Sequence, residues 1–437
     1  MSWLDFLQTK KECFIDFGRA VHLDIVEDEE ELFQAALHAF EKGKMLDAYE
    51  YYLRSLINFS HNSSNENITL KREEETLYFT LLQGSAKVEG YITDEKLYGE
   101  VLITKATTAP VALKRRLLER NYQFTYVSYV SDEKYLKLKL YQDNITMNPQ
   151  KLFFPLRELA LNADFDKEFI ASEFTQTPLC ETEHLSQIEA QELSIKYEYM
   201  QIWIKELEEK LLSLPSNDNA GMQAFLYLNI FLKIDYLLAP KYRISQKIAK
   251  KIEIYFSDEE TTIESKNDEL KKYLESLKEM VFEEFSQNFY NAKYTFSPIE
   301  KSSYEELCTF ISESLLKIRW YKNNRHLLII PTIYSYMAFH SFYNYGINAP
   351  LKELLHTLVV VFNSDYFTAL GCEGYYNIEK EEFAKRSIIQ SIDEIVAKYQ
   401  NKYKNLHSFS GELNFNSINE FAHSYYQALK NLDFEEM

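Results

Sequence analysis

The sequence predicts an α+β protein, with a mixed N-terminal half built on an antiparallel sheet and an all-helical C-terminal half. Strand-like alternation of apolar and polar residues is confined to residues 77–141, whereas from residue 186 onward the apolar spacing is helical. Only 10 glycines and 9 prolines occur in 437 residues, which favours long helices over loops. A chain of this length is expected to form two domains, 1–174 and 186–437, joined by a linker at 175–185.

Residues 29–58 are expected to form a helical hairpin, because apolar residues recur at helical spacing on both sides of Gly43. The strands are expected at residues 77–82, 86–92, 97–105, 122–130 and 135–141. A helix over 110–121 begins at Pro110, a residue favoured in the first turn, and a last helix near 149–163 completes the unit. The expected order is therefore α-βββ-α-ββ-α.

This order of elements, over residues 29–174, resembles the class I type III secretion chaperones and their YbjN-like relatives. These are small acidic proteins whose sheet and helices hold secretion substrates or other polypeptides. The resemblance implies a polypeptide partner and a homodimer through the N-terminal domain, and it transfers no catalytic residue. The chain departs from the family in its basic stretch, its extension at 1–28 and its fused helical half.

The helical half divides at short polar or Pro/Gly breaks. Helices are expected at residues 186–214, 220–238, 244–256, 267–289, 304–323, 327–345, 351–362, 379–403 and 417–432. The blocks 225–256 and 333–367 share one order, a long aromatic helix, an Ala-Pro step and an amphipathic helix ending in Tyr-Phe. They indicate either an internal duplication or the shared periodicity of amphipathic helices.

The formal net charge of −19 weighs against duplex nucleic acid or an anionic membrane as the primary partner. One stretch departs from this balance through Lys105, Lys114, Arg115, Arg116, Arg120, Lys134, Lys137 and Lys139. Lys137 and Lys139 alternate with leucines, which is typical of a strand with one solvated face. The alternative is a docking site for acidic partners or RNA.

No motif for catalysis, cofactor binding or metal binding is present. The glycines allow neither a dinucleotide-binding nor a P-loop motif, and HExxH does not occur. Cys13, Cys180, Cys308 and Cys372 are far apart and are expected to be lone reduced thiols. The N-terminus lacks a signal-peptide pattern, and the longest apolar run, 326–342, is interrupted by Pro331. A cytoplasmic protein without membrane insertion, cofactor or metal is therefore expected.

Aromatic residues concentrate between 334 and 345, at a density that exceeds what one buried helix face can hold. The candidate partner-binding residues are Tyr334, Tyr336, Phe339, Tyr343 and Tyr345, together with Lys137 and Lys139. The leading hypothesis is a non-enzymatic cytoplasmic protein-binding protein, a chaperone, adaptor or scaffold that holds a polypeptide. The alternative is an enzyme or small-ligand sensor whose site lies in the helical half and follows no local motif.

Overall fold

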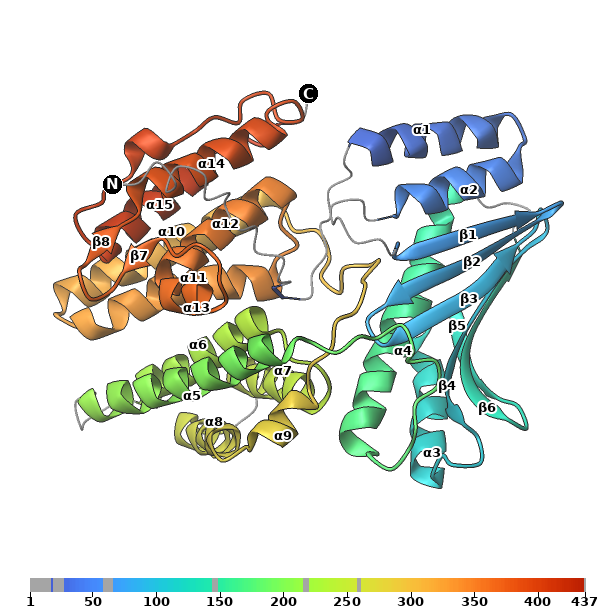
Figure 1. Ribbon diagram of the computed structural model, residues 1–437, viewed down its shortest axis with the longest axis horizontal. Coiled ribbons are helices and arrows are strands. Elements are labelled where there is room, and N and C mark those ends of the chain that lie inside the picture. Colours follow the sequence, from blue (N-terminus) through green and yellow to red (C-terminus); the bar gives the residue numbers. More distant parts are fainter. Residues whose placement is uncertain are drawn as a thin grey trace, which may run out of the picture.

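The computed structural model describes residues 17–18, 27–57, 66–143, 148–214, 220–257 and 261–435. A six-stranded antiparallel sheet with its helices forms the N-terminal half, and the C-terminal half is built from helices (Figure 1). This arrangement confirms the predicted α+β fold class. Figure 1 shows the two halves side by side, with α4 on the side of the sheet that faces the helical half.

The N-terminal half follows the predicted order with one additional strand. Its elements are α1 (Glu27–Glu41), α2 (Met45–Ser55), β1 (Ile68–Glu73), β2 (Thr76–Gln83), β3 (Ala86–Ile92), β4 (Lys96–Lys105), α3 (Val111–Arg120), β5 (Val127–Ser131), β6 (Tyr135–Asp143) and α4 (Phe153–Glu173). The strands lie in the order β1-β2-β3-β4-β6-β5, and each neighbouring pair is antiparallel. The unpredicted strand is β1, an edge strand that pairs along its whole length with β2.

Helix α4 packs on the inner face of the sheet because every second strand residue presents an apolar side chain to it. Buried side chains on this face include Leu77, Phe79, Leu81, Val88, Leu97, Val101 and Leu138, which pack with Leu156, Leu159 and Ala160 of α4. Gly99 of β4, which lies opposite Gly90 of β3, faces this helix. A Cβ at Gly99 would lie 3.0 Å from a methyl group of Leu159, so glycine there permits the close approach.

The helical half contains eleven α-helices and one short hairpin among the described residues. The helices are α5 (Ala190–Ser213), α6 (Ala220–Leu238), α7 (Tyr242–Phe256), α8 (Ile263–Lys278), α9 (Phe282–Ser286), α10 (Tyr304–Asn323), α11 (Ile330–Asn344), α12 (Ala349–Phe362), α13 (Ser364–Ala369), α14 (Lys385–Tyr399) and α15 (Ile418–Lys430). The hairpin of β7 (Tyr376–Asn377) and β8 (Glu382–Phe383) lies where the sequence predicts the start of a helix at 379. The predicted helix 267–289 is divided into α8 and α9. The internal duplication stays a prediction.

Buried apolar side chains form two separate clusters, one in each half. Residues 290–297 of the helical half cross to the N-terminal cluster, where Phe296 is buried and contacts Phe153 edge to face at 5.4 Å. The segment predicted as a linker, 175–185, also packs on the sheet, since the backbone N–H of Cys180 donates to the carbonyl of Ile103 at 3.0 Å. The two halves are therefore joined by more than one chain crossing.

The state of the cysteines corrects one sequence-based expectation. Cys180 and Cys308 are free, but Cys372 is disulfide-bonded, so the prediction of four lone reduced thiols is wrong. Cys13 lies outside the described residues. Within the part of the chain that the structure describes, every helix is too short or too polar to cross a membrane.

Candidate partner-binding surface on the open face of the sheet

Four tyrosines form a continuous row on the face of the sheet that points away from α4. Tyr78 on β2 lies opposite Tyr91 on β3, Tyr91 opposite Tyr98 on β4, and Tyr98 opposite Tyr141 on β6. The rings of Tyr78 and Tyr91 are 6.3 Å apart, and those of Tyr91 and Tyr98 are stacked at 5.3 Å. We call these four residues the tyrosine row. Helices α1 to α4 all contribute to the core on the inner face, so the outer face carries none of them.

The row is exposed at its ends and supported in its middle. Tyr78 and Tyr141 are 42% and 68% exposed, whereas Tyr91 and Tyr98 are half-buried between their neighbours. The Tyr98 hydroxyl donates to Glu100 at 2.5 Å, and burial together with this hydrogen bond raises the pKa of the Tyr98 phenol. The central rings are therefore held in place by their stacking on each other and by the hydrogen bond of Tyr98.

The two lysines that the sequence singles out lie on this same face. The Lys137 ammonium is 3.1 Å from Asp132 and 3.4 Å from Glu100, and the Lys139 ammonium is 3.9 Å from Glu100. The Lys139 ammonium also lies 5.6 Å from the ring centre of Tyr98. Each lysine thus has a carboxylate partner, and the surface around the tyrosine row is balanced in charge.

The aromatic residues predicted to bind a partner in the helical half lie mainly inside it. Tyr334 and Phe339 are buried in the core, and the Tyr334 hydroxyl is hydrogen-bonded to Nδ1 of His423 at 3.1 Å. Tyr336, Tyr343 and Tyr345 are half-buried. Tyr334 and Phe339 are not open to a partner in this structure, and partner binding by the other three stays a prediction.

A histidine with a strongly lowered pKa lies within this aromatic group. The rings of His340 and Phe310 stack at 4.5 Å, and Tyr336 and Tyr345 pack around them. Burial lowers the pKa of His340 to about 4. The imidazole is therefore neutral at neutral pH and acts as one more flat ring in the packing.

Among the buried charged residues of α4, Glu168 contacts the helical half and Lys167 contacts the segment that leads to it. Lys167 donates to the carbonyls of Cys180 at 2.7 Å and Ser85 at 3.1 Å, and burial lowers its pKa to about 8. Asp164 accepts from the backbone N–H and the hydroxyl of Ser85 at 2.7 and 2.8 Å. Glu168 accepts from the Tyr290 hydroxyl at 3.0 Å. These contacts satisfy the buried charges and fix the junction.

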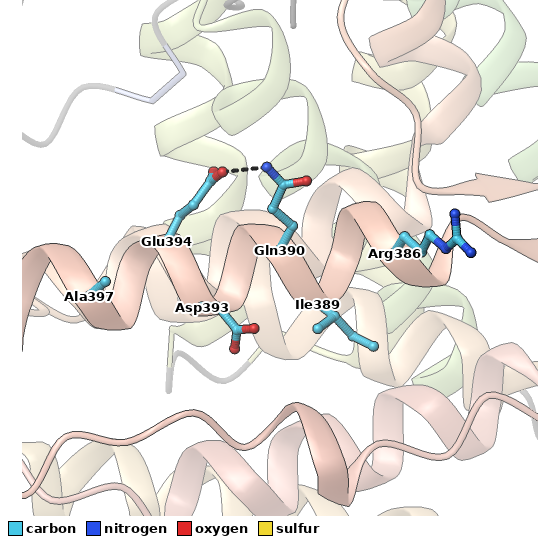
Figure 2. A pocket seen from close by; sticks show the side chains of 6 residues that line it. All are labelled: Arg386, Ile389, Gln390, Asp393, Glu394 and Ala397. Atoms are coloured by element: carbon cyan, nitrogen blue, oxygen red, sulfur yellow. Dashed lines mark hydrogen bonds between the residues drawn. The ribbon is translucent and has the colours of Figure 1, made fainter. Parts of the chain in front are cut away.

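Two hollows on the helical half are lined by side chains that already bind each other. One, of about 540 Å³, lies between α7 and α8, where Lys251 pairs with Glu269 at 2.6 Å and Arg243 pairs with Glu284 at 3.0 Å. The other lies on α14, and Figure 2 shows its lining residues along one helix, with Gln390 donating to Glu394 at 2.6 Å. No cluster of three or more potential metal ligands occurs among the described residues.

No family model, curated protein or solved structure matches this chain. The resemblance of its element order to the type III secretion chaperones therefore stays a prediction. The tyrosine row is a feature that the sequence pattern did not reveal. Its only sequence signal is that each of the four residues occupies an outward position of its own strand.

Proposed function

We propose that this chain is a non-enzymatic protein-binding protein, a chaperone, adaptor or scaffold, that holds a polypeptide segment on the open face of its sheet. The observation that carries the proposal is the tyrosine row. Tyrosine offers a large apolar area and a polar tip, and it loses little conformational entropy on binding. Four adjacent rings concentrate these properties on a face that no described helix covers.

The length of the row suits a short segment of chain. Neighbouring strands lie about 4.8 Å apart, so the three steps from Tyr78 to Tyr141 span about 14 Å. An extended chain advances about 3.3 Å per residue, so four to five residues, roughly, would cover the row. The half-buried central rings give such a segment a firm surface, and the exposed outer rings can close on its sides.

The charges around the row favour a polypeptide over single-stranded nucleic acid. Stacking of bases on aromatic rings is common, but it is accompanied by cations that follow the phosphate backbone. Here Lys137 and Lys139 are paired with Glu100 and Asp132. A nucleic acid would have to displace these carboxylates, whereas a polypeptide can use both signs of charge.

The test compares variants of the two exposed rings with matched controls elsewhere. A peptide is selected on the purified chain from a displayed library of random sequences, and its Kd is measured by fluorescence anisotropy. Tyr78→Ser with Tyr141→Ser should raise the Kd by about tenfold or more, the usual effect of removing aromatic anchors. Tyr51→Ser with Tyr122→Ser removes two exposed tyrosines outside the row and should leave the Kd unchanged. Circular dichroism checks that both variants fold.

Other outcomes would overturn the proposal. Equal Kd values in the row variant and the control would show that the row does not hold the peptide. Binding of oligo(dT) by the wild type, lost in the row variant and steeply dependent on salt, would assign the face to nucleic acid. If the wild type is a dimer that the row variant converts to monomers, the face is a self-association surface.

The proposal also includes a cytoplasmic location and, as expected from the sequence, self-association through the N-terminal domain, here by a surface other than the tyrosine row. The disulfide at Cys372 weighs against a reducing compartment, where such bonds are rare. Fractionation of cells that express the tagged chain decides the location.

A further inference from the structure

A second exposed surface lies at the C-terminal end of α10, in a part of the sequence without acidic residues. From Ser314 to Lys352 the chain contains no Asp or Glu, although its net charge is −19. Four cations of this stretch, Lys317, Arg319, Lys322 and Arg325, are exposed. The stretch is therefore basic within an acidic chain.

Four large apolar side chains are exposed in the same place. Leu316 and Trp320 lie on α10, and Leu327 and Leu328 follow in the short 3-10 helix Leu327–Ile329. They are between 57% and 70% exposed. Single exposed apolar residues are ordinary, but four within thirteen positions of one helix end are a patch.

The chain reverses at the end of α10, between the tryptophan and the two leucines. The backbone N–H of His326 donates to the carbonyl of Tyr321 at 2.9 Å, and that of Arg325 donates to Lys322 at 3.2 Å. This is a Schellman turn, and Arg325 takes its left-handed position with φ +62°. The His326 ring then stacks on Trp320 at 6.1 Å, immediately before Leu327.

Two of the cations border the apolar side chains of α10, and no carboxylate of the described residues forms an ion pair with any of the four. At 100° per residue, Lys317 and Arg319 lie on the two sides of the stripe formed by Leu316 and Trp320. None of the four cations forms an ion pair with any residue that the structure describes. Some exposed cations elsewhere are paired, as Lys278 is with Glu208 at 2.8 Å.

The negative end of the helix dipole accounts for cations in the last turn of α10, but not for the exposed leucines and tryptophan. An exposed apolar group flanked by Lys317 and Arg319 has the composition of a membrane-interface anchor. Tryptophan and leucine enter the boundary between headgroups and acyl chains, while Lys and Arg stay with the phosphates. A protein partner would need a recess of matching shape, whereas a bilayer accepts projecting side chains of any arrangement.

We propose that Leu316, Trp320, Leu327 and Leu328, with Lys317 and Arg319 beside them and Arg325 in the turn between, form a docking surface for the anionic face of a lipid membrane. The contact is peripheral, and it is independent of the tyrosine row. Because the chain as a whole is strongly acidic, attraction to an anionic membrane through this surface would favour one orientation of the molecule.

The test uses the full chain and sedimentation with vesicles of phosphatidylcholine, with and without about 30% phosphatidylserine, at about 0.1 M salt. We expect binding to the anionic vesicles and little to the neutral ones. Each cation near such a surface contributes about fivefold in affinity, so Lys317→Gln with Arg319→Gln should weaken binding by about 25-fold. Trp320→Ser with Leu328→Ser should weaken it by about tenfold or more.

Matched controls remove the same kinds of side chain from other surfaces. Lys271→Gln with Lys272→Gln changes two exposed lysines of α8, and Leu212→Ser changes an exposed leucine of α5. These controls, and the tyrosine-row variant, should bind vesicles like the wild type. Equal binding to neutral and anionic vesicles, or wild-type binding by both patch variants, would overturn the proposal. Binding of polyglutamate without binding of anionic vesicles would also overturn it, and would assign the surface to an acidic protein.

Discussion

The side chain of Gln83 provides a direct test of how the two halves are joined. It is 1% exposed at the end of β2, and its amide meets the segment that crosses from the helical half. Its Nε2 donates to the carbonyl of Phe296 at 3.1 Å, and its Oε1 accepts from the backbone N–H groups of Thr295 at 3.0 Å and Phe296 at 2.8 Å. The amide thus pairs with this segment as a neighbouring strand would.

Gln83→Met keeps the length and volume of the side chain and removes all three hydrogen bonds. Each is worth about 1 kcal/mol net, and the buried backbone groups of Thr295 and Phe296 lose their partners. We therefore expect the free energy of unfolding to fall by about 3 kcal/mol. A loss of this size is a large part of the stability of a typical domain.

Urea unfolding followed by far-ultraviolet circular dichroism measures the effect, and limited proteolysis reports whether residues 290–297 become accessible. The matched control is Gln187→Met, because Gln187 is exposed and lies in the same junction. The control should shift stability by less than about 0.5 kcal/mol. Equal unfolding midpoints for the two variants would refute the reasoning, since the hydrogen bonds of Gln83 would then contribute nothing to the junction.

Two further predictions concern the helical half. Burial lowers the pKa of His340 from 6.5 to about 4. As the pH falls, the imidazole is therefore protonated in the unfolded chain before it is protonated in the folded chain. The stability that this group contributes is complete above pH 6.5 and is lost as the pH falls toward 4. His340→Phe keeps the stacking on Phe310 and should flatten the pH dependence of the thermal midpoint over this range, and an unchanged profile would contradict the assignment. Arg325→Gly should raise the free energy of unfolding by about 1 kcal/mol, because glycine suits the left-handed position, while vesicle binding falls by about fivefold. If the Arg325→Gly variant is more stable and still binds vesicles like the wild type, Arg325 takes no part in the proposed membrane contact.

The sequence predicted most helices because their apolar periodicity is long and their ends are marked. The predicted ranges 220–238 and 304–323 agree with α6 and α10 at both ends. Strand β1 was missed because it contains only two apolar residues, Ile68 and Leu70, and is formed by pairing with β2. Local sequence does not contain that information, because an edge strand depends on its neighbour.

The candidate surface was harder to predict than the fold. Alternation with leucines placed Lys137 and Lys139 correctly on the outer face of β6, but the tyrosine row depends on the register of four strands. No spacing along the chain aligns Tyr78 with Tyr141. The aromatic residues of α11 were expected to be too many for one buried face of the helix. That helix is in fact packed by α6, α10, α12 and α15, so it is buried on several sides and has room for Tyr334 and Phe339 in the core.

The junction and the end of α10 differ in whether their charged groups have partners among the described residues, and this difference bears on function. At the junction, the buried charges Asp164, Lys167 and Glu168 each have partners, so the chain alone explains their presence. At the end of α10, unpaired cations, exposed apolar side chains and a left-handed Arg325 occur together. The exposed apolar side chains lower the solubility of the isolated chain, and the left-handed backbone of Arg325 lowers its stability. Unfavourable features that gather in one place and stabilise nothing within the chain are expected where a surface contacts a binding partner.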